Sequence, residues 1–535
     1  MESSNPNSNH IKLIVTLGGL TLASLLILLD STIIGTAVPK ITDEFHSLKD
    51  VGWYGSAFPL GSSALVPLSG GIYHNFPLKW SFLVFFAIFE AGSAICGSAT
   101  SSAALIAGRV VAGVGASGLI NGAFTILSVM VPGEKMPTVL GFLFGIAQLG
   151  SVLGPVLGGI LTENVSWRWC FYINLPFGGL VAIPLVIVHI PDQITKKSPL
   201  LVLRNIHKHI DLVGCALFTG AIVQLLLALQ FGGNAFAWSS SQVIGLFIGS
   251  AVTFAVWAFW NWEAKNALLP FDIIKRPVVF SSGINYAFLV ASIQGSFYFL
   301  PIYFQAVKQS GPITSGVYLL AIILPQLPMA VISGKLVSKY GVIPPFALVG
   351  AAFNTLGLGL YSLLQPTSPV ASWIGFSIIS GFGRGIGLNP PLVAAQNAAT
   401  REEIAATTAF IVWCQYIGPT ILLTLLNLVF DNVLRSQLNT LAPDVNAQAV
   451  INAGATGFRE IISTQDLPNV LQAYANAVDS TFYLAVAAGF ISWAAGWGMG
   501  WQKLATKEAV PQPQGVVEQK DEKTCNEDEE VVPGT

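Results

Sequence analysis

The chain has 535 residues, of which 10% are charged and 53% belong to the hydrophobic set. Soluble globular proteins carry about 25% charged residues, so a chain this long with so little charge could not cover a water-facing surface. The composition favours an integral membrane protein over a water-soluble multidomain enzyme. The formal net charge is −2 and no basic stripe is present, so no nucleic-acid partner is expected.

Long apolar runs recur along the sequence, and a bilayer-spanning helix needs about 20 mostly apolar residues. Two of the runs, 52–73 and 371–394, are interrupted by small residues or proline, which membrane helices tolerate. We expect an all-α membrane protein with fourteen transmembrane helices. The predicted spans are 13–37, 52–73, 80–98, 103–130, 138–161, 171–190, 211–230, 242–262, 278–304, 313–333, 344–364, 371–394, 404–429 and 479–500.

The lysines and arginines favour one orientation of these spans. If the N-terminus lies in the cytoplasm, seventeen of the 25 basic residues fall on the cytoplasmic side and six on the outer side. The remaining two, Arg109 and Arg384, fall inside spans. Because cytoplasmic loops carry an excess of Lys and Arg, we predict that both termini are cytoplasmic.

A faint internal repeat suggests how the spans are grouped. Residues 70–79 and 334–341 each connect the second and third spans of a six-span group. The basic linker between the groups is either a helix at the inner membrane surface or a solvated connection. We expect a cytoplasmic N-terminal tail (1–12), a six-helix bundle (13–190), a cytoplasmic linker (191–210), an inserted helix pair (211–262), a second six-helix bundle (277–500) with a long outer loop (430–478), and a disordered acidic cytoplasmic tail (505–535).

Glycines dominate the predicted span 138–161. Gly150, Gly154 and Gly158 are spaced by four residues and line one helix face, against which another helix can pack closely. Pro155 removes one backbone hydrogen bond and bends the span. A pivot for rocking motions and a static packing face both fit this pattern. The full set is Gly141, Gly150, Gly154, Pro155, Gly158 and Gly159.

These six residues form the pattern G-x8-G-x3-GP-x2-GG, which resembles the fifth-span antiporter motif of the major facilitator superfamily. Residues 167–178 resemble the WRW-F-IN-P-G signature of its fourteen-span drug:proton antiporters. Residues 29–39 and 108–115 are similar to the LDxTI…A-P and RxxxGxG motifs. The resemblance implies the major facilitator fold, with two six-helix bundles and two inserted helices. It is closest to fungal exporters of toxins and other secondary metabolites.

Three ionisable residues lie inside predicted spans at a common depth. Asp30 and Glu90 lie about 12 Å, and Arg109 about 9 Å, from the outer ends at 1.5 Å per residue. Ionisable groups are costly inside a membrane and point to function. The resemblance implies that the first and fourth spans are neighbours. We predict that Asp30 binds a proton and that Arg109 modulates its affinity, with Glu90 as a third candidate. The alternative is a static buried ion pair.

Aromatic and amide residues in the predicted span 278–304 are candidates for a substrate site, since such side chains suit amphipathic organic molecules. Helical spacing puts three of them near one face. Ordinary packing with an aromatic belt is the alternative. Arg384 has no acidic residue in the apolar parts of neighbouring spans, so its partner is substrate, a carbonyl or water. The candidates are Asn285, Tyr286, Gln294, Phe297, Tyr298 and Arg384.

The predicted function is proton-coupled efflux of small amphipathic molecules, such as a toxin, another secondary metabolite or drugs, by alternating access. No HExxH or GxxxxGK[ST] is present, and no DxxxD-like acidic cluster faces the membrane, so we expect no enzyme, metal, cofactor or direct ATP drive. The alternatives are an importer or facilitator of the same superfamily, for example for a siderophore, and a membrane sensor. The expected partners are substrate, protons and lipid. We expect a monomer in the plasma membrane, with the vacuolar membrane as the alternative.

Overall fold

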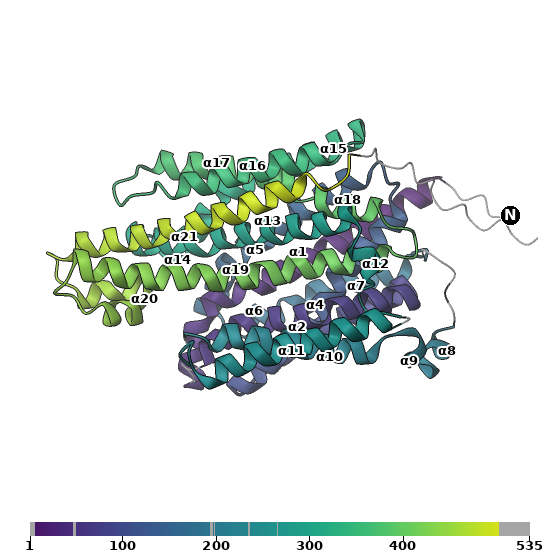
Figure 1. The fold of residues 1–535 in the computed structure, drawn as a ribbon, viewed down its shortest axis with the longest axis horizontal. Coiled ribbons are helices and arrows are strands. Elements are labelled where there is room, and N and C mark those ends of the chain that lie inside the picture. Colours follow the sequence, from purple (N-terminus) through teal and green to yellow (C-terminus); the bar gives the residue numbers. More distant parts are fainter. Residues whose placement is uncertain are drawn as a thin grey trace, which may run out of the picture.

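Helices dominate the part of the chain that the structure, a computed structural model, describes. Apart from one isolated bridge between Gly232 and Phe236, the described residues form no β-structure. The long helices run roughly along the longest axis of the molecule (Figure 1). Eleven of the described helices are long and apolar enough to cross a membrane, which confirms the prediction of an all-α membrane protein. The described residues are 6–46, 50–192, 196, 198–233, 236–264 and 266–501.

The first half of the chain contains long helices and three short ones, of which α8 and α9 lie in the predicted linker. Leu200 and Leu203 in the linker are exposed, whereas Val202 is buried. The helices are α1 (Pro6–Phe45), α2 (Val51–Asn75), α3 (Leu78–Gly97), α4 (Ser102–Met130), α5 (Met136–Asn164), α6 (Trp169–Tyr172), α7 (Asn174–Ile187), α8 (Pro199–Arg204), α9 (Ile206–His209), α10 (Leu212–Phe231) and α11 (Ser241–Glu263).

The second half includes a short π-helix and several helices broken by local geometry. One break follows Tyr340, because Gly341 adopts the left-handed conformation (φ 72°) that commonly ends a helix. The elements are α12 (Phe271–Ile274), α13 (Pro277–Ile302), the π-helix η2 (Tyr303–Val307), α14 (Pro312–Tyr318), α15 (Leu320–Tyr340), α16 (Pro344–Tyr361), α17 (Val370–Gly387), α18 (Pro390–Asn397), α19 (Ile404–Leu441), α20 (Ala447–Ile461) and α21 (Leu467–Gly496).

Each of the fourteen predicted spans coincides with a helix or with two consecutive helices. Three of them, α2, α16 and α17, are not among the eleven strongly apolar helices. Glycine, serine and proline lower the mean hydropathy of α2, while Asn354 and Arg384 do so in α16 and α17. All three helices nevertheless pack among the others, α2 against α4, and α16 against α17.

The predicted outer loop 430–478 is largely helical. The helix α19 continues to Leu441 and α21 begins at Leu467, with α20 between them at the end of the molecule farthest from the N-terminus (Figure 1). The apolar run in the sequence ends before α19 does, because the C-terminal turns of this helix expose polar residues. These turns still keep a buried apolar stripe that includes Leu434 and Leu438.

Of the two predicted tails, only the N-terminal one can be compared with the structure. The helix α1 begins at Pro6, so helix replaces part of the predicted tail 1–12. The predicted acidic tail 505–535 lies outside the described residues, as do residues 193–195 and 197 of the linker.

Glycine brings consecutive helices into backbone contact. A Cβ atom at Gly92 of α3 would overlap the backbone of Ala112 in α4. The same holds for Gly383 of α17 against the backbone of Asn354 in α16. Such close approach favours van der Waals packing between membrane helices, which lack a hydrophobic driving force in lipid.

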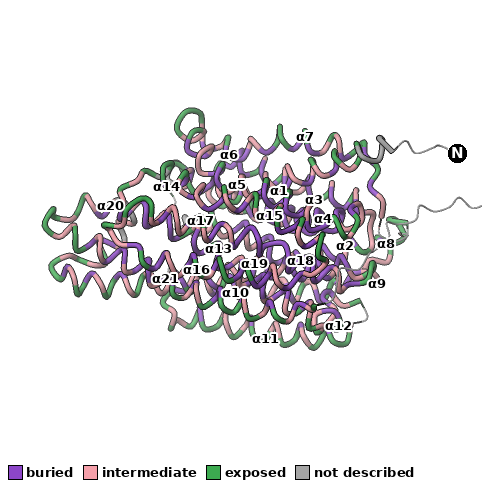
Figure 2. Tube along the Cα trace, turned by 90° about the horizontal axis from the view of Figure 1, so that it is seen from above, coloured by how far each residue is buried: buried purple, intermediate pink, exposed green. Residues whose placement is uncertain are grey.

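The helices α10 and α11 lie along one side of the molecule in both views (Figures 1 and 2). The Thr219 hydroxyl of α10 donates to the Ala64 carbonyl of α2 at 3.2 Å. The Phe218 ring of α10 lies 5.6 Å from that of Trp413 in α19. This pair therefore covers helices from both halves of the chain and leaves the buried centre to other helices, including α1, α5, α13 and α19 (Figure 2).

Candidate functional site

A cavity of about 800 Å³ lies between α1 and α5 on one side and α13 and α14 on the other. Its wall mixes aromatic rings with amide and hydroxyl groups, a composition that suits amphipathic organic molecules. From α13, Tyr286, Gln294, Phe297 and Tyr298 line it. The structure thus brings four of the five candidate residues of this helix to one cavity.

Asn285, the fifth candidate on α13, faces α21 instead. Its side-chain amide donates to the Ser492 carbonyl at 2.7 Å, and the Ser492 hydroxyl donates to the Asn285 carbonyl at 3.0 Å. Neighbouring residues on a helix point roughly 100° apart, so Tyr286 can face the cavity while Asn285 does not. The placement of Asn285 in the substrate wall is therefore wrong, and its side chain joins α13 to α21.

The opposite wall of the cavity comes from α1 and α5, and the sequence analysis did not single it out. The helix α1 contributes Ser31, Thr32 and Thr36, and α5 contributes Gln148 and Ser151. On both helices the lining residues recur every three or four positions, which marks one helix face. A stripe of hydroxyl and amide groups within an apolar run is the sequence signal that could have identified this wall.

The cavity extends toward the C-terminal ends of α1 and α5. Its charged lining residues, Lys40 and Glu163, both lie near those ends. The rest of the described lining is neutral, so the cavity is a mainly apolar chamber with one residue of each sign at one end.

At the opposite end, α5 packs directly against α15. A Cβ atom at Gly141 would overlap the Ala330 carbonyl, and one at Gly334 would overlap the Pro137 carbonyl. Two helices from different halves of the chain are therefore in backbone contact beyond the cavity. This contact closes the path between α5 and α15 at that end.

Asp30 and Arg109 form a buried ion pair beside the cavity. Arg109 Nη1 lies 2.5 Å from Asp30 Oδ2, and the side chains are 1% and 0% exposed. The guanidinium also lies over the rings of Phe58 and Phe171, at 4.8 and 5.8 Å. Asp30 immediately precedes Ser31, which lines the cavity, so the carboxylate lies one residue from the cavity wall along α1.

Two neutral residues missed by the sequence analysis complete this cluster. The Asn174 amide of α7 donates to Asp30 Oδ1 at 3.1 Å and to the Ser93 hydroxyl of α3 at 3.0 Å. Both residues are fully buried. Asn174 stands inside the signature at 167–178, and this was the signal that could have identified it. Four helices, α1, α3, α4 and α7, therefore meet at one carboxylate.

Glu90 lies on α3 one turn from Ser93 and is not part of the ion pair. It packs against Gly178 of α7, where a Cβ atom would overlap the Glu90 carboxyl group. Both carboxyl oxygens lack a hydrogen-bond partner among the described residues. Gly178 follows Asn174 by one helical turn, so Glu90 is adjacent to the Asp30 cluster without a direct contact to Asp30.

The glycine-rich motif divides between three neighbours. Gly150, Gly154 and Gly158 all face α1, and a Cβ atom at Gly150 would lie 2.5 Å from the Leu25 carbonyl oxygen. Pro155 and Gly159 line the cavity, while Gly141 faces α15. The face spaced by four residues is thus the surface that holds α5 against α1.

Arg384 is fully buried in α17 and differs from Arg109 in both partner and depth. Its Nε donates to Asn354 Oδ1 at 3.3 Å, and its guanidinium lies 4.9 Å from the Phe297 ring centroid. Measured from the helix starts, it lies about 21 Å along α17, whereas Arg109 lies about 10 Å along α4. The two arginines are therefore not at equivalent depths.

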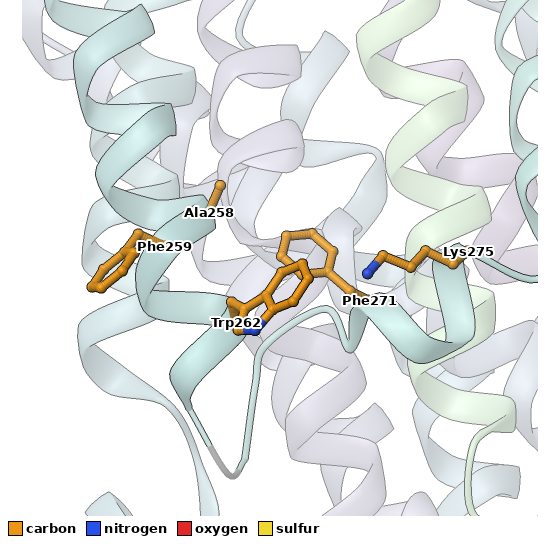
Figure 3. Close-up of a pocket in the computed structure, with 5 residues that line it drawn as sticks. All are labelled: Ala258, Phe259, Trp262, Phe271 and Lys275. Atoms are coloured by element: carbon orange, nitrogen blue, oxygen red, sulfur yellow. The ribbon is translucent and has the colours of Figure 1, made fainter.

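A second, smaller hollow lies on the surface where α11 meets α12. Figure 3 shows Phe259, Trp262, Phe271 and Lys275 around it, and the Lys275 amine lies 4.2 Å from the Trp262 ring centroid. Exposed tryptophans with a lysine are typical of a membrane interface.

Known proteins resemble the chain along most of its length. The family model described as Major Facilitator Superfamily matches residues 20–422. The MFS-type transporter pigP of Monascus ruber is 48% identical over 506 residues, covering 94% of this chain and 89% of the relative. The efflux pump mlcE of Penicillium citrinum is 44% identical over 529 residues, with coverage of 96% and 95%.

Among solved structures, the proton:xylose symporter XylE superimposes with a TM-score of 0.60 over 93% of this chain and 98% of that chain. The two are 12% identical, so this likeness concerns the fold. The family model and the fungal relatives all describe transporters rather than enzymes. The chain belongs to the major facilitator superfamily of membrane transporters.

Proposed function

We propose that the protein exports small amphipathic organic molecules in exchange for protons, by alternating access. The observation that carries the proposal is the cavity of about 800 Å³, which lies beside the buried Asp30–Arg109 pair and is closed at one end by α5 and α15. A site between two sets of helices, closed at one end, is what a rocking transporter requires. Relatives named efflux pumps support the direction of transport.

The proposed topology has fourteen membrane helices with both termini in the cytoplasm. It groups residues 13–190 and 277–500 as two six-helix bundles, with 211–262 as an inserted pair. The distribution of lysine and arginine supports this orientation. In it, Lys40 and Glu163 lie at the outer end of the cavity, and the contact between α5 and α15 lies toward its cytoplasmic end.

In the proposed mechanism Asp30 carries the proton. Burial favours the neutral form of a carboxyl group and a neighbouring cation favours the charged form. Separation of Asp30 from Arg109, or the entry of water, would therefore change the proton occupancy. Asn174 holds one carboxyl oxygen and fixes the orientation of the group. Glu90, one turn from Ser93, is a second proton acceptor for the same cluster.

The glycine-rich motif is proposed to guide the motion. The face formed by Gly150, Gly154 and Gly158 keeps α5 and α1 together as one unit. The contact of Gly141 with Ala330 joins opposite halves and must separate when the cytoplasmic end opens. The protein is proposed to work as a monomer in the plasma membrane, with the vacuolar membrane as the alternative.

The test is counterflow in proteoliposomes loaded with two fluorescent amphiphiles, the cation rhodamine 6G and the anion pyrenebutyrate. We expect a proton gradient to accelerate loss of at least one probe, and Asp30→Asn to abolish that acceleration. The matched control is Asp444→Asn, an exposed residue between α19 and α20. Gradient-independent flux in the unmodified protein would indicate a facilitator, and no flux of either probe would favour a sensor. Either result would overturn the proposal.

A further inference from the structure

Arg384 is a buried cation that forms no salt bridge with any acidic residue that the structure describes. Its side chain is 0% exposed, and Nη1 and Nη2 have no hydrogen-bond partner in the part of the chain that the structure describes. The salt bridges among the described residues are Asp30–Arg109, Glu44–Arg168 and Arg276–Glu403, so none involves Arg384. Its one hydrogen bond goes to a neutral amide.

Asn354 is already held by other neutral groups. Its amide donates to the Ser292 hydroxyl at 2.9 Å, and the Ser380 hydroxyl donates to Asn354 Oδ1 at 3.4 Å. The oxygen that receives Arg384 is thus shared between two donors. Arginine remains charged inside proteins and carries five N–H donors, so this single long contact satisfies little of its capacity.

A buried guanidinium without a counter-ion is costly, because desolvation is not offset by an opposite charge. The Phe297 ring compensates only in part, through its attraction for cations. Intramembrane arginines commonly mark a substrate pathway. The two free N–H groups of Arg384 therefore indicate a partner that is supplied from outside the protein.

The cavity is the source from which such a partner can arrive. Phe297 lines the cavity, and its ring centroid lies 4.9 Å from the Arg384 guanidinium, so this side chain connects the cavity wall to Arg384. Leu388, four residues after Arg384 and directly after the end of α17, also lines the cavity. The charged lining residues Lys40 and Glu163 carry opposite charges, whereas Arg384, next to Phe297, has no acidic partner among the described residues.

We propose that the cavity binds an organic anion whose carboxylate, or a similar planar oxyanion, pairs with Nη1 and Nη2 of Arg384 after the Phe297 ring turns aside. Guanidinium and carboxylate match in planar, bidentate geometry. The rings of Tyr286, Phe297 and Tyr298 would hold the apolar body of the ligand. That this anion is the exported cargo rests on the proposed function, whereas its binding does not.

The test compares binding of pyrenebutyrate with that of its uncharged amide, pyrenebutyramide, to the full chain in lipid nanodiscs, corrected for empty nanodiscs. We expect the unmodified protein to bind the acid at least tenfold more tightly than the amide. Arg384→Gln should reduce this preference to less than threefold without changing the affinity for the amide. Arg384→Lys, which keeps the charge but not the planar fork, should retain part of the preference.

The matched control is Arg435→Gln, an exposed arginine of α19, which should leave both affinities unchanged. Unchanged amide binding in Arg384→Gln shows that the variant is folded. Phe297→Leu keeps the charge and should keep the preference for the acid. Equal binding of acid and amide by the unmodified protein, equal weakening of both by Arg384→Gln, or no binding of either probe would each overturn the proposal.

The two proposals fail in different experiments. Selective binding of the acid through Arg384, with no gradient-driven flux, would leave the anion site intact and overturn proton-coupled export. Gradient-driven flux of rhodamine 6G, with no preference for the acid in the binding assay, would leave proton-coupled export intact and overturn the anion site.

Discussion

Arg109 and Arg384 are built into the protein in the same way and end with different partners. Each follows a glycine that brings its helix against the preceding long helix: Gly108 approaches Cys96 of α3, and Gly383 approaches Asn354 of α16. Each side chain is at most 1% exposed and lies about 5 Å from a phenylalanine ring centroid. Only Arg109 meets a carboxylate.

The difference comes from the helices that supply the partners. The helix α1 places Asp30 against Arg109, whereas α13 and α16 place Ser292 and Asn354 near Arg384. Asp30 neutralises Arg109 within the fold, whereas no acidic residue that the structure describes neutralises Arg384. Substitutions at the two sites should therefore change the free energy of unfolding in opposite directions: removal of the Arg109 partner should lower it, and removal of the Arg384 charge should not.

The largest expected effect is at the paired site. Asp30→Asn leaves Arg109 buried without its counter-ion, and removing one partner of a buried pair costs about 3–5 kcal/mol. We expect a decrease of this size in the free energy of unfolding, measured in mixed micelles of mild detergent and SDS.

The double variant Asp30→Asn with Arg109→Met removes both charges and should recover part of this loss, since the two residues interact directly. A change below about 1 kcal/mol in Asp30→Asn would contradict the comparison. That outcome would mean that Asp30 is already neutral in the folded protein.

A smaller effect, of opposite sign, is expected at the unpaired site. Arg384→Met replaces a buried charge with an apolar side chain of similar volume, and no buried carboxylate is left without its partner. Replacement of buried charges by apolar residues is often neutral or stabilising by about 1–4 kcal/mol. We expect the free energy of unfolding of Arg384→Met to equal or exceed that of the unmodified protein. Destabilisation by more than about 1 kcal/mol would show that the contacts to Asn354 and Phe297 suffice as a partner.

The paired site was partly predictable from the sequence, and the reason is chemical. Asp30 and Arg109 stand out because charged residues are rare in apolar spans, and their similar depth predicts that they can meet. The cavity-lining residues of α13 share a face because helical spacing is fixed. The fourteen helical segments were predictable because apolar runs of sufficient length have few alternatives to helix in lipid.

The remaining partners could not be predicted because they depend on how helices meet. Asn174, Ser93 and Asn354 are neutral, and many neutral polar residues lie inside spans without forming such a cluster. Gly141 and Gly150 belong to one sequence motif, yet one faces α15 and the other α1. Which glycine joins the two halves is set by the conformation of the transporter, and no local pattern records it.

The smallest effect is expected at a third arginine, Arg276, which is paired but partly exposed. It lies at the start of α13, and its two terminal nitrogens bond the Glu403 carboxylate at 2.7 and 2.8 Å. This contact lowers the pKa of Glu403 from 4.5 to about 2. Pairs near water contribute about 0.2–1 kcal/mol, so Glu403→Gln should cost no more than this at pH 7 and less at high salt.

The pH dependence of this pair has a definite sign. Because the pKa of Glu403 is lower in the folded protein than in the unfolded chain, the pair stabilises the fold above about pH 4.5, and that contribution is lost as the pH falls toward 2. The difference in unfolding free energy between the unmodified protein and Glu403→Gln should therefore shrink from pH 7 to pH 3. A difference that grew on acidification would mean that the pKa of Glu403 is not lowered in the folded protein, and that the pair with Arg276 does not stabilise the fold. Burial, rather than pairing alone, would then separate Arg109 from the other arginines.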